Sequence, residues 1–215
     1  MNTTGKFIAF EGGEGTGKST QARLLMEALE RRGIRCVLTR EPGGTQGAEA
    51  IRDLLLAPPY DHRRGEGWGA QAEALLFAAA RADHVVRLIR PAIAEGNWVI
   101  CDRFVDSSRA YQGMAGDLGD ESVRALHRIG SGGLLPDLTV LLGATDERVA
   151  ERLRMRDGND ADAIGGRSVA YHARVNRAFQ DLAAAEPERF AVINGDGTIA
   201  EVHGRVMAAL APLLC

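Results

Sequence analysis

Hydrophobic residues gather in five short runs, separated by longer stretches where hydrophobic positions recur every three or four residues. Short continuous runs are typical of strands buried on both faces of a sheet, and the longer spacing is typical of helices. The predicted strands are Phe7–Glu11, Cys36–Arg40, Trp98–Asp102, Leu138–Leu142 and Phe190–Ile193. The predicted helices are Ser19–Arg32, Ala48–Leu56, Ala70–Glu95, Ser107–Gln112, Glu121–Ile129, Asp146–Arg156, Ala170–Ala185 and Ile199–Leu213.

The alternation of strands and helices predicts an α/β fold with three layers. Five parallel strands would be joined by right-handed crossovers and covered by helices on both faces. The 215 residues fit one domain, and neither a repeat nor a linker divides the chain. We therefore expect a single domain over residues 1–215. The Gly/Asp-rich stretch Asp157–Gly166 is the one segment that we expect to be mobile.

A glycine-rich segment follows the first predicted strand and opens the first predicted helix. It resembles the phosphate loop of P-loop NTPases, in which backbone N–H groups and a helix N-terminus surround a triphosphate. Lys18 would reach the β- and γ-phosphates, and the Ser19 hydroxyl would join the Mg²⁺ shell. A nucleoside triphosphate site is therefore predicted at Gly12, Gly13, Glu14, Gly15, Thr16, Gly17, Lys18, Ser19 and Thr20.

Charged residues stand at the carboxyl ends of three predicted strands, where open parallel sheets bind ligands. Besides Glu11, these are the segment Arg40–Gly44 and the pair Asp102 and Arg103. Asp102 ends an apolar run, as expected of a Walker B carboxylate near Mg²⁺, although a helix cap or a salt bridge is the alternative. The planar guanidinium of Arg103 suits two phosphate oxygens.

The long predicted helix Ala70–Glu95 carries a second signal. At 100° per residue, Phe77, Arg81 and His84 share one face. An aromatic ring one turn from an arginine can stack on a base whose edge the arginine binds, but packing against a helix or a second subunit is equally compatible. The opposite face, predicted to contact the core, carries Leu75, Ala79, Ala82, Val86, Ile89 and Ile93.

Composition excludes several classes of protein. A net charge of −3 argues against a bulk electrostatic role on nucleic acid. The cysteines Cys36, Cys101 and Cys215 have neither a disulfide nor a metal-site spacing. No apolar run is long enough for a bilayer, and the N-terminus lacks a signal-peptide core, so we expect a cytoplasmic protein without a membrane partner.

The predicted helix Asp146–Arg156 has acidic residues at its start and arginines at its end. Such a helix is usually a solvated surface element. Its place before the Gly/Asp-rich stretch favours a second interpretation, a lid over residues 152–167 whose arginines neutralise the transferred phosphoryl group. The candidate lid arginines are Arg152, Arg154 and Arg156.

Taken together, these motifs resemble the thymidylate kinase family over nearly the whole chain. The phosphate loop is shared by many families, whereas the order Arg-Glu-Pro-Gly-Gly, Leu-Phe-Ala-Ala-Ala-Arg, Asp-Arg-Phe and Ala-Tyr-Gln-Gly is far more specific. The resemblance implies ATP-dependent phosphorylation of dTMP to dTDP in dTTP biosynthesis, with Mg²⁺. It also implies a homodimer packed through helices.

The resemblance implies a role for each site residue. Lys18, Arg103 and the lid arginines would be catalytic, Ser19 and Asp102 would hold the metal ion, and residues 12–20 would bind ATP. Phe77 would stack on thymine, Arg81 would reach a thymine carbonyl, and Tyr111 would pack under the deoxyribose. The complete set implied to bind the substrate is Glu11, Arg40, Arg52, Phe77, Arg81, Arg103, Ser108, Tyr111 and Gln112.

The chain departs from the family in the lid. Where relatives with this kind of phosphate loop continue with Asp-Arg-x-Glu, this chain reads Asp162-Ala163-Ile164-Gly165. Arg167 is a nearby substitute, and the choice among Arg152, Arg154 and Arg156 stays open. Two other functions also stay open: a kinase of the same fold acting on another pyrimidine nucleotide or a deoxynucleoside, and an ATPase module that works through a partner.

Overall fold

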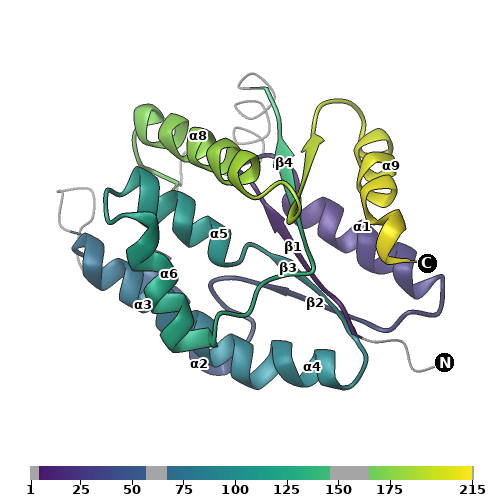
Figure 1. Ribbon diagram of the computed structural model, residues 1–215, viewed down its shortest axis with the longest axis horizontal. Helices are drawn as coiled ribbons and strands as arrows, with labels where there is room; N and C mark the ends of the chain where they lie inside the picture. Colours follow the sequence, from purple (N-terminus) through teal and green to yellow (C-terminus); the bar gives the residue numbers. More distant parts are fainter. Residues whose placement is uncertain (1–4, 57–66, 146–164, 215) are drawn as a thin grey trace.

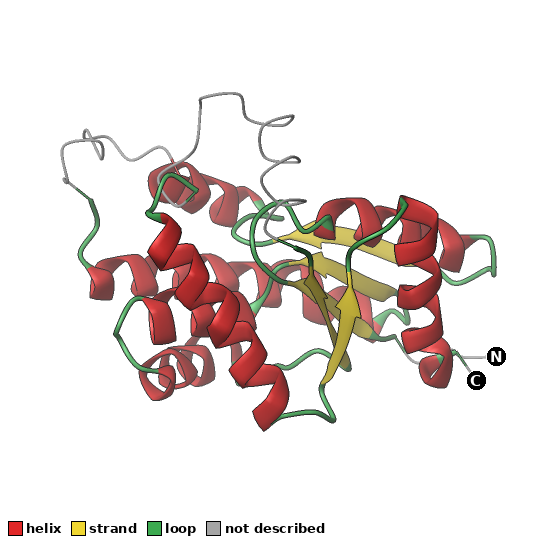
Figure 2. Ribbon diagram, turned by 90° about the horizontal axis from the view of Figure 1, so that it is seen from above, coloured by secondary structure: helices red, strands yellow, loops and turns green. Residues whose placement is uncertain are grey.

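The computed structural model describes residues 5–56, 67–145 and 165–214, which form five parallel strands in the order β2-β3-β1-β4-β5 (Figures 1 and 2). The predicted three-layer α/β fold is confirmed, as are all five predicted strands. β4 and β5 each extend one residue past the prediction. The strands are β1 (Phe7–Glu11), β2 (Cys36–Arg40), β3 (Trp98–Asp102), β4 (Leu138–Gly143) and β5 (Phe190–Asn194).

The described helices begin and end close to the predicted positions. The predicted helix Asp146–Arg156 lies outside the described residues. No described helix is long and apolar enough to cross a membrane. The α-helices are α1 (Lys18–Glu30), α2 (Gln46–Leu56), α3 (Ala70–His84), α4 (Arg90–Ala94), α5 (Val105–Ser108), α6 (Asp120–Ser131), α8 (Val169–Ala185) and α9 (Ile199–Leu210). The other helices are the π-helices Val85–Ile89 and Arg109–Ala115 and the 3₁₀ turn Ala211–Leu213.

The sheet separates two apolar layers, and β1 contributes to both. Ile8 and Phe10 are fully buried against α1 and α9, which cover one face of the sheet (Figure 1). Phe7 and Ala9 point the other way, toward Phe104 and the π-helix Val85–Ile89. Alternate side chains of a strand face opposite sides, so a continuous apolar run fills both layers. Packing on both faces therefore holds the carboxyl end of β1 in a fixed position.

The apolar face that we predicted for helix Ala70–Glu95 is wrong from Leu75 to Val86. Leu75 is 55% exposed and Val86 is 63% exposed, whereas Phe77, Arg81 and His84 are buried. The helix changes to π geometry at Val85–Ile89, just before Pro91, and a wider turn there shifts the angular position of the residues that follow. This shift comes after Leu75, so the exposure of Leu75 has a different cause. The buried side of α3 faces polar groups beyond the sheet edge, and only Ile89 of that predicted face is fully buried in the core.

The second π-helix, Arg109–Ala115, forms part of the segment that follows β3. We predicted one helix over Ser107–Gln112, but α5 ends at Ser108 and the π-helix continues to Ala115. This π-helix packs against α8 and α6, on the same side of the sheet as α3. Tyr111 and Gln112 on this π-helix are buried, as is Ser108 at the end of α5.

Candidate active site

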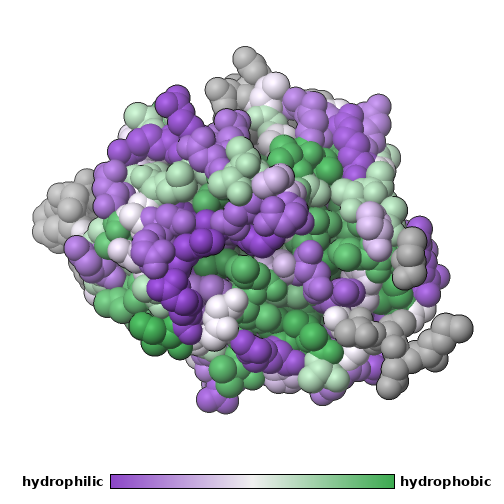
Figure 3. Space-filling model, viewed as in Figure 1, coloured by the Kyte–Doolittle hydropathy of each residue, from purple (hydrophilic) through white to green (hydrophobic). Residues whose placement is uncertain are grey.

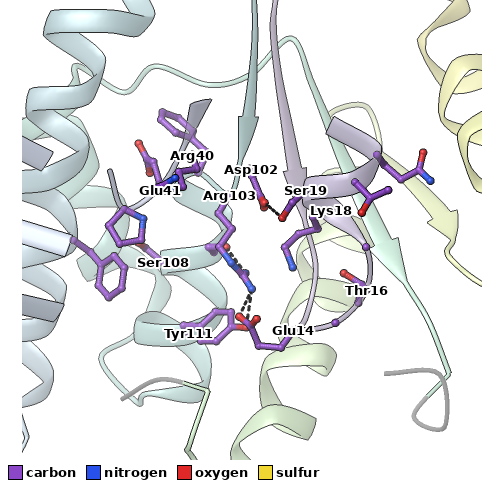
Figure 4. Close-up of a pocket in the computed structure, with 18 of the residues that line it drawn as sticks. Glu14, Thr16, Lys18, Ser19, Arg40, Glu41, Asp102, Arg103, Ser108 and Tyr111 are labelled. Atoms are coloured by element: carbon purple, nitrogen blue, oxygen red, sulfur yellow. Dashed lines mark hydrogen bonds and ion pairs between the residues drawn. The ribbon is translucent and has the colours of Figure 1, made fainter. Parts of the chain in front are cut away.

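A cavity of about 740 Å³ opens at the carboxyl ends of β1, β2 and β3 (Figure 4). Its walls come from the glycine-rich loop, from the segments after β2 and β3, and from α3. Gly12, Gly13 and Glu11 are the described candidates that do not line it. The candidates that line it are Glu14, Gly15, Thr16, Gly17, Lys18, Ser19, Thr20, Arg40, Arg52, Phe77, Arg81, Asp102, Arg103, Ser108, Tyr111 and Gln112.

The glycine-rich loop adopts a backbone that suits glycine. Gly12 has φ +134°, and a Cβ there would lie 2.3 Å from the carbonyl oxygen of Leu142. Gly17 has φ +100° and gives α1 no side-chain cap, so the first-turn N–H groups of α1 face the loop. Such N–H groups together with a helix dipole favour an anion. The loop is therefore shaped for phosphate.

Lys18 is the first residue of α1, directly after the glycines of this loop, and is buried. Its Nζ donates to the carbonyl oxygen of Gly13 at 2.6 Å. Burial, followed by the nearby positive charge of Arg103, lowers the pKa of Lys18 to about 8. A lysine with a lowered pKa in an enclosed site gains most from an anionic ligand, because such a ligand favours its charged form.

Ser19 and Asp102 form a hydrogen-bonded pair at the end of β3, the serine hydroxyl donating to Oδ2 of the carboxylate (Figure 4). The other oxygen, Oδ1, is buried and has no partner among the described residues. A hydroxyl and a carboxylate are oxygen ligands of the kind that Mg²⁺ prefers. No described cluster of three acidic, histidine or cysteine side chains is suited to a metal ion. The pair fits Mg²⁺ that takes its other ligands from phosphate and water.

Arg103 directly follows β3, and its side chain lies between the glycine-rich loop and Tyr111. It has φ +71°, unusual for a residue with a side chain. Its Nη1 donates to the Gly12 carbonyl at 3.1 Å and to Ser107 Oγ at 3.0 Å, and its Nη2 pairs with Glu14. Its guanidinium carbon lies 5.2 Å from the Tyr111 ring centre. Several contacts thus hold a planar cation between the two ends of the cavity.

Glu11 is fully buried and lies beneath the cavity. One carboxylate oxygen accepts from the backbone N–H groups of Phe104 at 2.8 Å and Ser107 at 3.0 Å. The other oxygen accepts from the Ser107 hydroxyl at 2.5 Å. Burial, with the charge of Asp106 as the second cause, raises the pKa of Glu11 to about 7. In this structure Glu11 holds the segment after β3.

Arg81 is 3% exposed and contacts Glu41 and Ser108, which lie across the cavity from Lys18 and Thr16 of the loop (Figure 4). Its Nε donates to Glu41 Oε2 at 2.7 Å, and its Nη2 donates to Ser108 Oγ at 2.9 Å. His84 contacts the other oxygen of Glu41 at 3.1 Å. Phe77, one helical turn before Arg81, also lines the cavity. The predicted aromatic–arginine pair therefore faces the cavity.

Arg40 and Arg52 line the cavity near β2. Arg40 pairs with Glu49 at 3.1 Å and its side chain remains 55% exposed. Arg52 donates from Nη1 to the carbonyl oxygen of Pro42 at 2.7 Å. Arg40 and Arg52 line the same cavity as Phe77 and Arg81. This end can therefore bind an anionic group next to a planar ring.

The sequence analysis named Glu41 only within the charged segment Arg40–Gly44, without a role, and it missed Glu73. Glu41 holds Arg81, and Glu73 accepts a hydrogen bond from Gln112 Nε2 at 2.8 Å. Glu73 precedes Phe77 by one helical turn, a spacing that offered a signal. Arg167 also pairs with Glu73, so its side chain is on the side of Gln112 rather than at the phosphate loop. Arg152, Arg154 and Arg156 lie outside the described residues.

Comparisons with known proteins place these features in a family. A family model described as thymidylate kinase matches residues 10–206. A protein of Rhizorhabdus wittichii named thymidylate kinase is 55% identical over 210 residues, covering 98% of this chain and 99% of the relative. One of Rhodopseudomonas palustris with the same name is 46% identical over 212 residues, covering 97% and 89%. The crystal structure of thymidylate kinase from Ehrlichia chaffeensis superposes with a TM-score of 0.75 at 32% identity, covering 96% and 98%.

Proposed function

Because this chain belongs to the thymidylate kinase family and phosphorylates dTMP in dTTP biosynthesis, we propose which ligands and residues carry out the transfer. ATP and Mg²⁺ occupy the glycine-rich end of the cavity, and dTMP occupies the end lined by Phe77 and Arg81. One observation carries this proposal: a single cavity joins the phosphate loop to the aromatic–arginine pair, with Arg103 between them.

At the donor end, the loop over residues 12–20 binds the ATP phosphates through backbone N–H groups and Lys18. Ser19 and Asp102 hold Mg²⁺, for which the unpartnered Asp102 Oδ1 offers a ligand. When bound, the ion supplies positive charge to the phosphate oxygens. Glu14 belongs to this loop, but its carboxylate reaches Arg103 on the acceptor side.

At the acceptor end, Phe77 stacks on thymine while Arg81 donates to a base carbonyl. Ser108 and Gln112 lie on the base side, and Tyr111 packs under the deoxyribose. Arg40, Arg52 and Arg103 bind the dTMP phosphate, and Glu11 keeps the segment after β3 in place for Arg103. Arginine suits this purpose because one guanidinium can hold two phosphate oxygens.

The transfer itself needs alignment and charge neutralisation more than proton removal. The acceptor is an ionised phosphate, so no strong general base is required. Holding the two phosphate groups end to end supplies much of the rate, and Lys18 and Arg103 neutralise charge on the group being transferred. Arg152, Arg154 and Arg156 remain candidates for a further catalytic cation from a lid over residues 152–167.

The whole chain, residues 1–215, acts as one kinase domain in this proposal, since one sheet contains strands from residue 7 to residue 194. It acts as a homodimer in the cytoplasm. The exposed apolar side chains Leu75 and Val86 on the long helix, with Ile129 on the adjacent α6, support a second copy as the partner. Figure 3 shows hydrophobic surface in the region that α3 and α6 occupy in Figure 1.

Phosphoryl transfer to a panel of acceptors tests the proposed function. The chain is incubated with ATP, Mg²⁺ and equal concentrations of dTMP, dUMP, dCMP or thymidine, and ADP release is measured. We expect dTMP to be the preferred acceptor, and omission of Mg²⁺ to stop turnover. A preference for thymidine, or ATP hydrolysis that ignores every acceptor, would reject the assignment.

A further inference from the structure

Three side chains connect residue 167 to the base end of the cavity. Gln112 Nε2 donates to Glu73 Oε1 at 2.8 Å, and Arg167 Nη2 pairs with the other oxygen, Glu73 Oε2. Gln112 is 4% exposed and Glu73 is 8% exposed. We propose that Glu73 is a positioning residue that keeps the amide oxygen of Gln112 turned toward the base of dTMP. Arg167 holds Glu73 in that position, and the proposal rests on the proposed function.

The orientation of the amide follows from the partners of Glu73. A carboxylate paired with a guanidinium only accepts hydrogen bonds. The group that Gln112 turns toward Glu73 must therefore be its NH₂, which leaves the amide oxygen on the opposite side. No described residue donates to that oxygen, and Gln112 lines the cavity. An acceptor with a fixed direction thus faces the ligand.

Arg167 is also connected by hydrogen bonds to the π-helix that carries Gln112. Its Nη1 donates to the Tyr171 hydroxyl at 2.6 Å, and that hydroxyl donates to the carbonyl oxygen of Tyr111 at 2.8 Å. The guanidinium also lies over the Tyr171 ring, 4.8 Å from its centre. One series of contacts runs from Arg167 through Glu73 to Gln112, and the other runs through Tyr171 to Tyr111. Since Tyr111 and Gln112 are neighbours, both series end on the same helical turn. This arrangement fixes the carboxylate as well as the amide.

The fixed acceptor lies beside a fixed donor. Arg81 donates to Ser108, which precedes Gln112 by one helical turn, and all three residues line the cavity. In the proposed complex Arg81 and Gln112 therefore contact the same edge of the ring. A donor next to an acceptor matches a carbonyl next to a ring N–H, as in thymine. Cytosine presents an amino group and a bare nitrogen in these two places, which is the reverse pattern. A site built for one pattern penalises the other, because buried polar groups would be left unpaired.

Replacing Glu73 by methionine tests the orientation, because methionine keeps the length and helix propensity but accepts no such bond. The full-length chain is assayed at saturating ATP with dTMP and with dCMP. In Glu73→Met we expect the KM for dTMP to rise about three- to tenfold, the effect of one net hydrogen bond. We expect kcat to stay within about twofold, and the preference for dTMP over dCMP in kcat/KM to fall by a similar factor.

Two further variants separate positioning from folding. Arg167→Met removes a side chain that is 28% exposed, so the fold is kept, and it should shift KM and the preference in the same direction by a smaller factor. Glu121→Gln, which breaks an exposed pair with Arg128, should leave both quantities unchanged. The proposal fails if Glu73→Met and Arg167→Met keep the wild-type KM and preference, or if kcat falls equally for both nucleotides at constant KM. Failure of the wild-type chain to use dTMP would instead count against the proposed function.

Discussion

Carboxylates hold most of the arginines that line the cavity. Arg81 pairs with Glu41, Arg103 with Glu14 and Arg40 with Glu49, so three cations are oriented before any nucleotide is bound. A pre-oriented guanidinium loses less conformational freedom when it meets a phosphate or a base. Lys18 differs, because the hydrogen bond that positions it goes to a backbone carbonyl. The protonation of Lys18 is therefore sensitive to an anionic ligand in the loop.

Substituting Lys18 by alanine should abolish turnover and leave the fold intact. Loss of one pre-organised donor costs on the order of 3 kcal/mol in the barrier, at least about a hundredfold in kcat. Steady-state kinetics measure this loss, and circular dichroism checks the fold. Turnover near the wild-type rate in a folded Lys18→Ala chain would exclude Lys18 from the reaction.

The same lysine predicts a pH dependence of ATP binding. Its pKa is about 8 in the free protein, and a bound triphosphate favours the charged form, so binding takes up a proton above that pH. Affinity for ATP should therefore decline as the pH rises through about 8. Calorimetry in buffers of different ionisation enthalpy measures the proton uptake, which Lys18→Ala should lack.

The sequence predicted the phosphate-loop end of the site better than the carboxylates that hold Arg81 and Gln112. Gly12 to Thr20 are contiguous, so a local pattern suffices to find them, and the structure brings Ser19 to Asp102 as expected for the metal pair. Glu41 lies far along the chain from its partner Arg81, and Glu73 lies far from its partner Gln112. The second pairing depends on how α3 crosses the segment after β3. No local pattern encodes that crossing.

At the scale of elements, two π-helices shape the acceptor end of the cavity. One interrupts the long helix after α3, and the other carries Tyr111 and Gln112. A π turn has no hydrophobic signature of its own, since the i→i+5 bond pattern leaves composition unchanged. The strands were predicted almost to the residue because apolar runs between helices are unambiguous. The buried face of α3 could not be predicted, because its neighbours are polar.

The buried face of α3 predicts how two substitutions change the affinity for dTMP. Phe77→Ala removes the stacking ring, and Arg81→Ala removes a buried donor and leaves Glu41 without its guanidinium partner. Each should weaken dTMP binding by about 1–3 kcal/mol, roughly five- to more than a hundredfold in Kd. ATP affinity should stay close to wild type. Calorimetric titration with dTMP and with ATP measures both, and wild-type dTMP affinity in the two variants would remove the stacking hypothesis.

At the scale of the whole molecule, the exposed apolar side chains of α3 and of the π-helix that follows it give a prediction about assembly. Burial of Leu75 and Val86 by a second copy would remove apolar surface from water, the main driving force of such contacts. Val86→Glu should convert the proposed dimer into monomers, because a carboxylate at an apolar contact loses hydration. Sedimentation measures the mass. Val169→Glu, at an 87% exposed valine on α8, is the matched control. A monomeric wild-type chain would exclude the dimer.

A crystal structure of the full chain with dTMP and a non-hydrolysable ATP analogue measures the ligand positions that the proposed transfer requires. We predict thymine on the Phe77 ring with its carbonyl at Arg81, the triphosphate on the loop over residues 12–20, and both phosphate groups beside Arg103. Thymine bound away from Phe77, or two phosphate groups too far apart for direct transfer, would overturn the proposed mechanism.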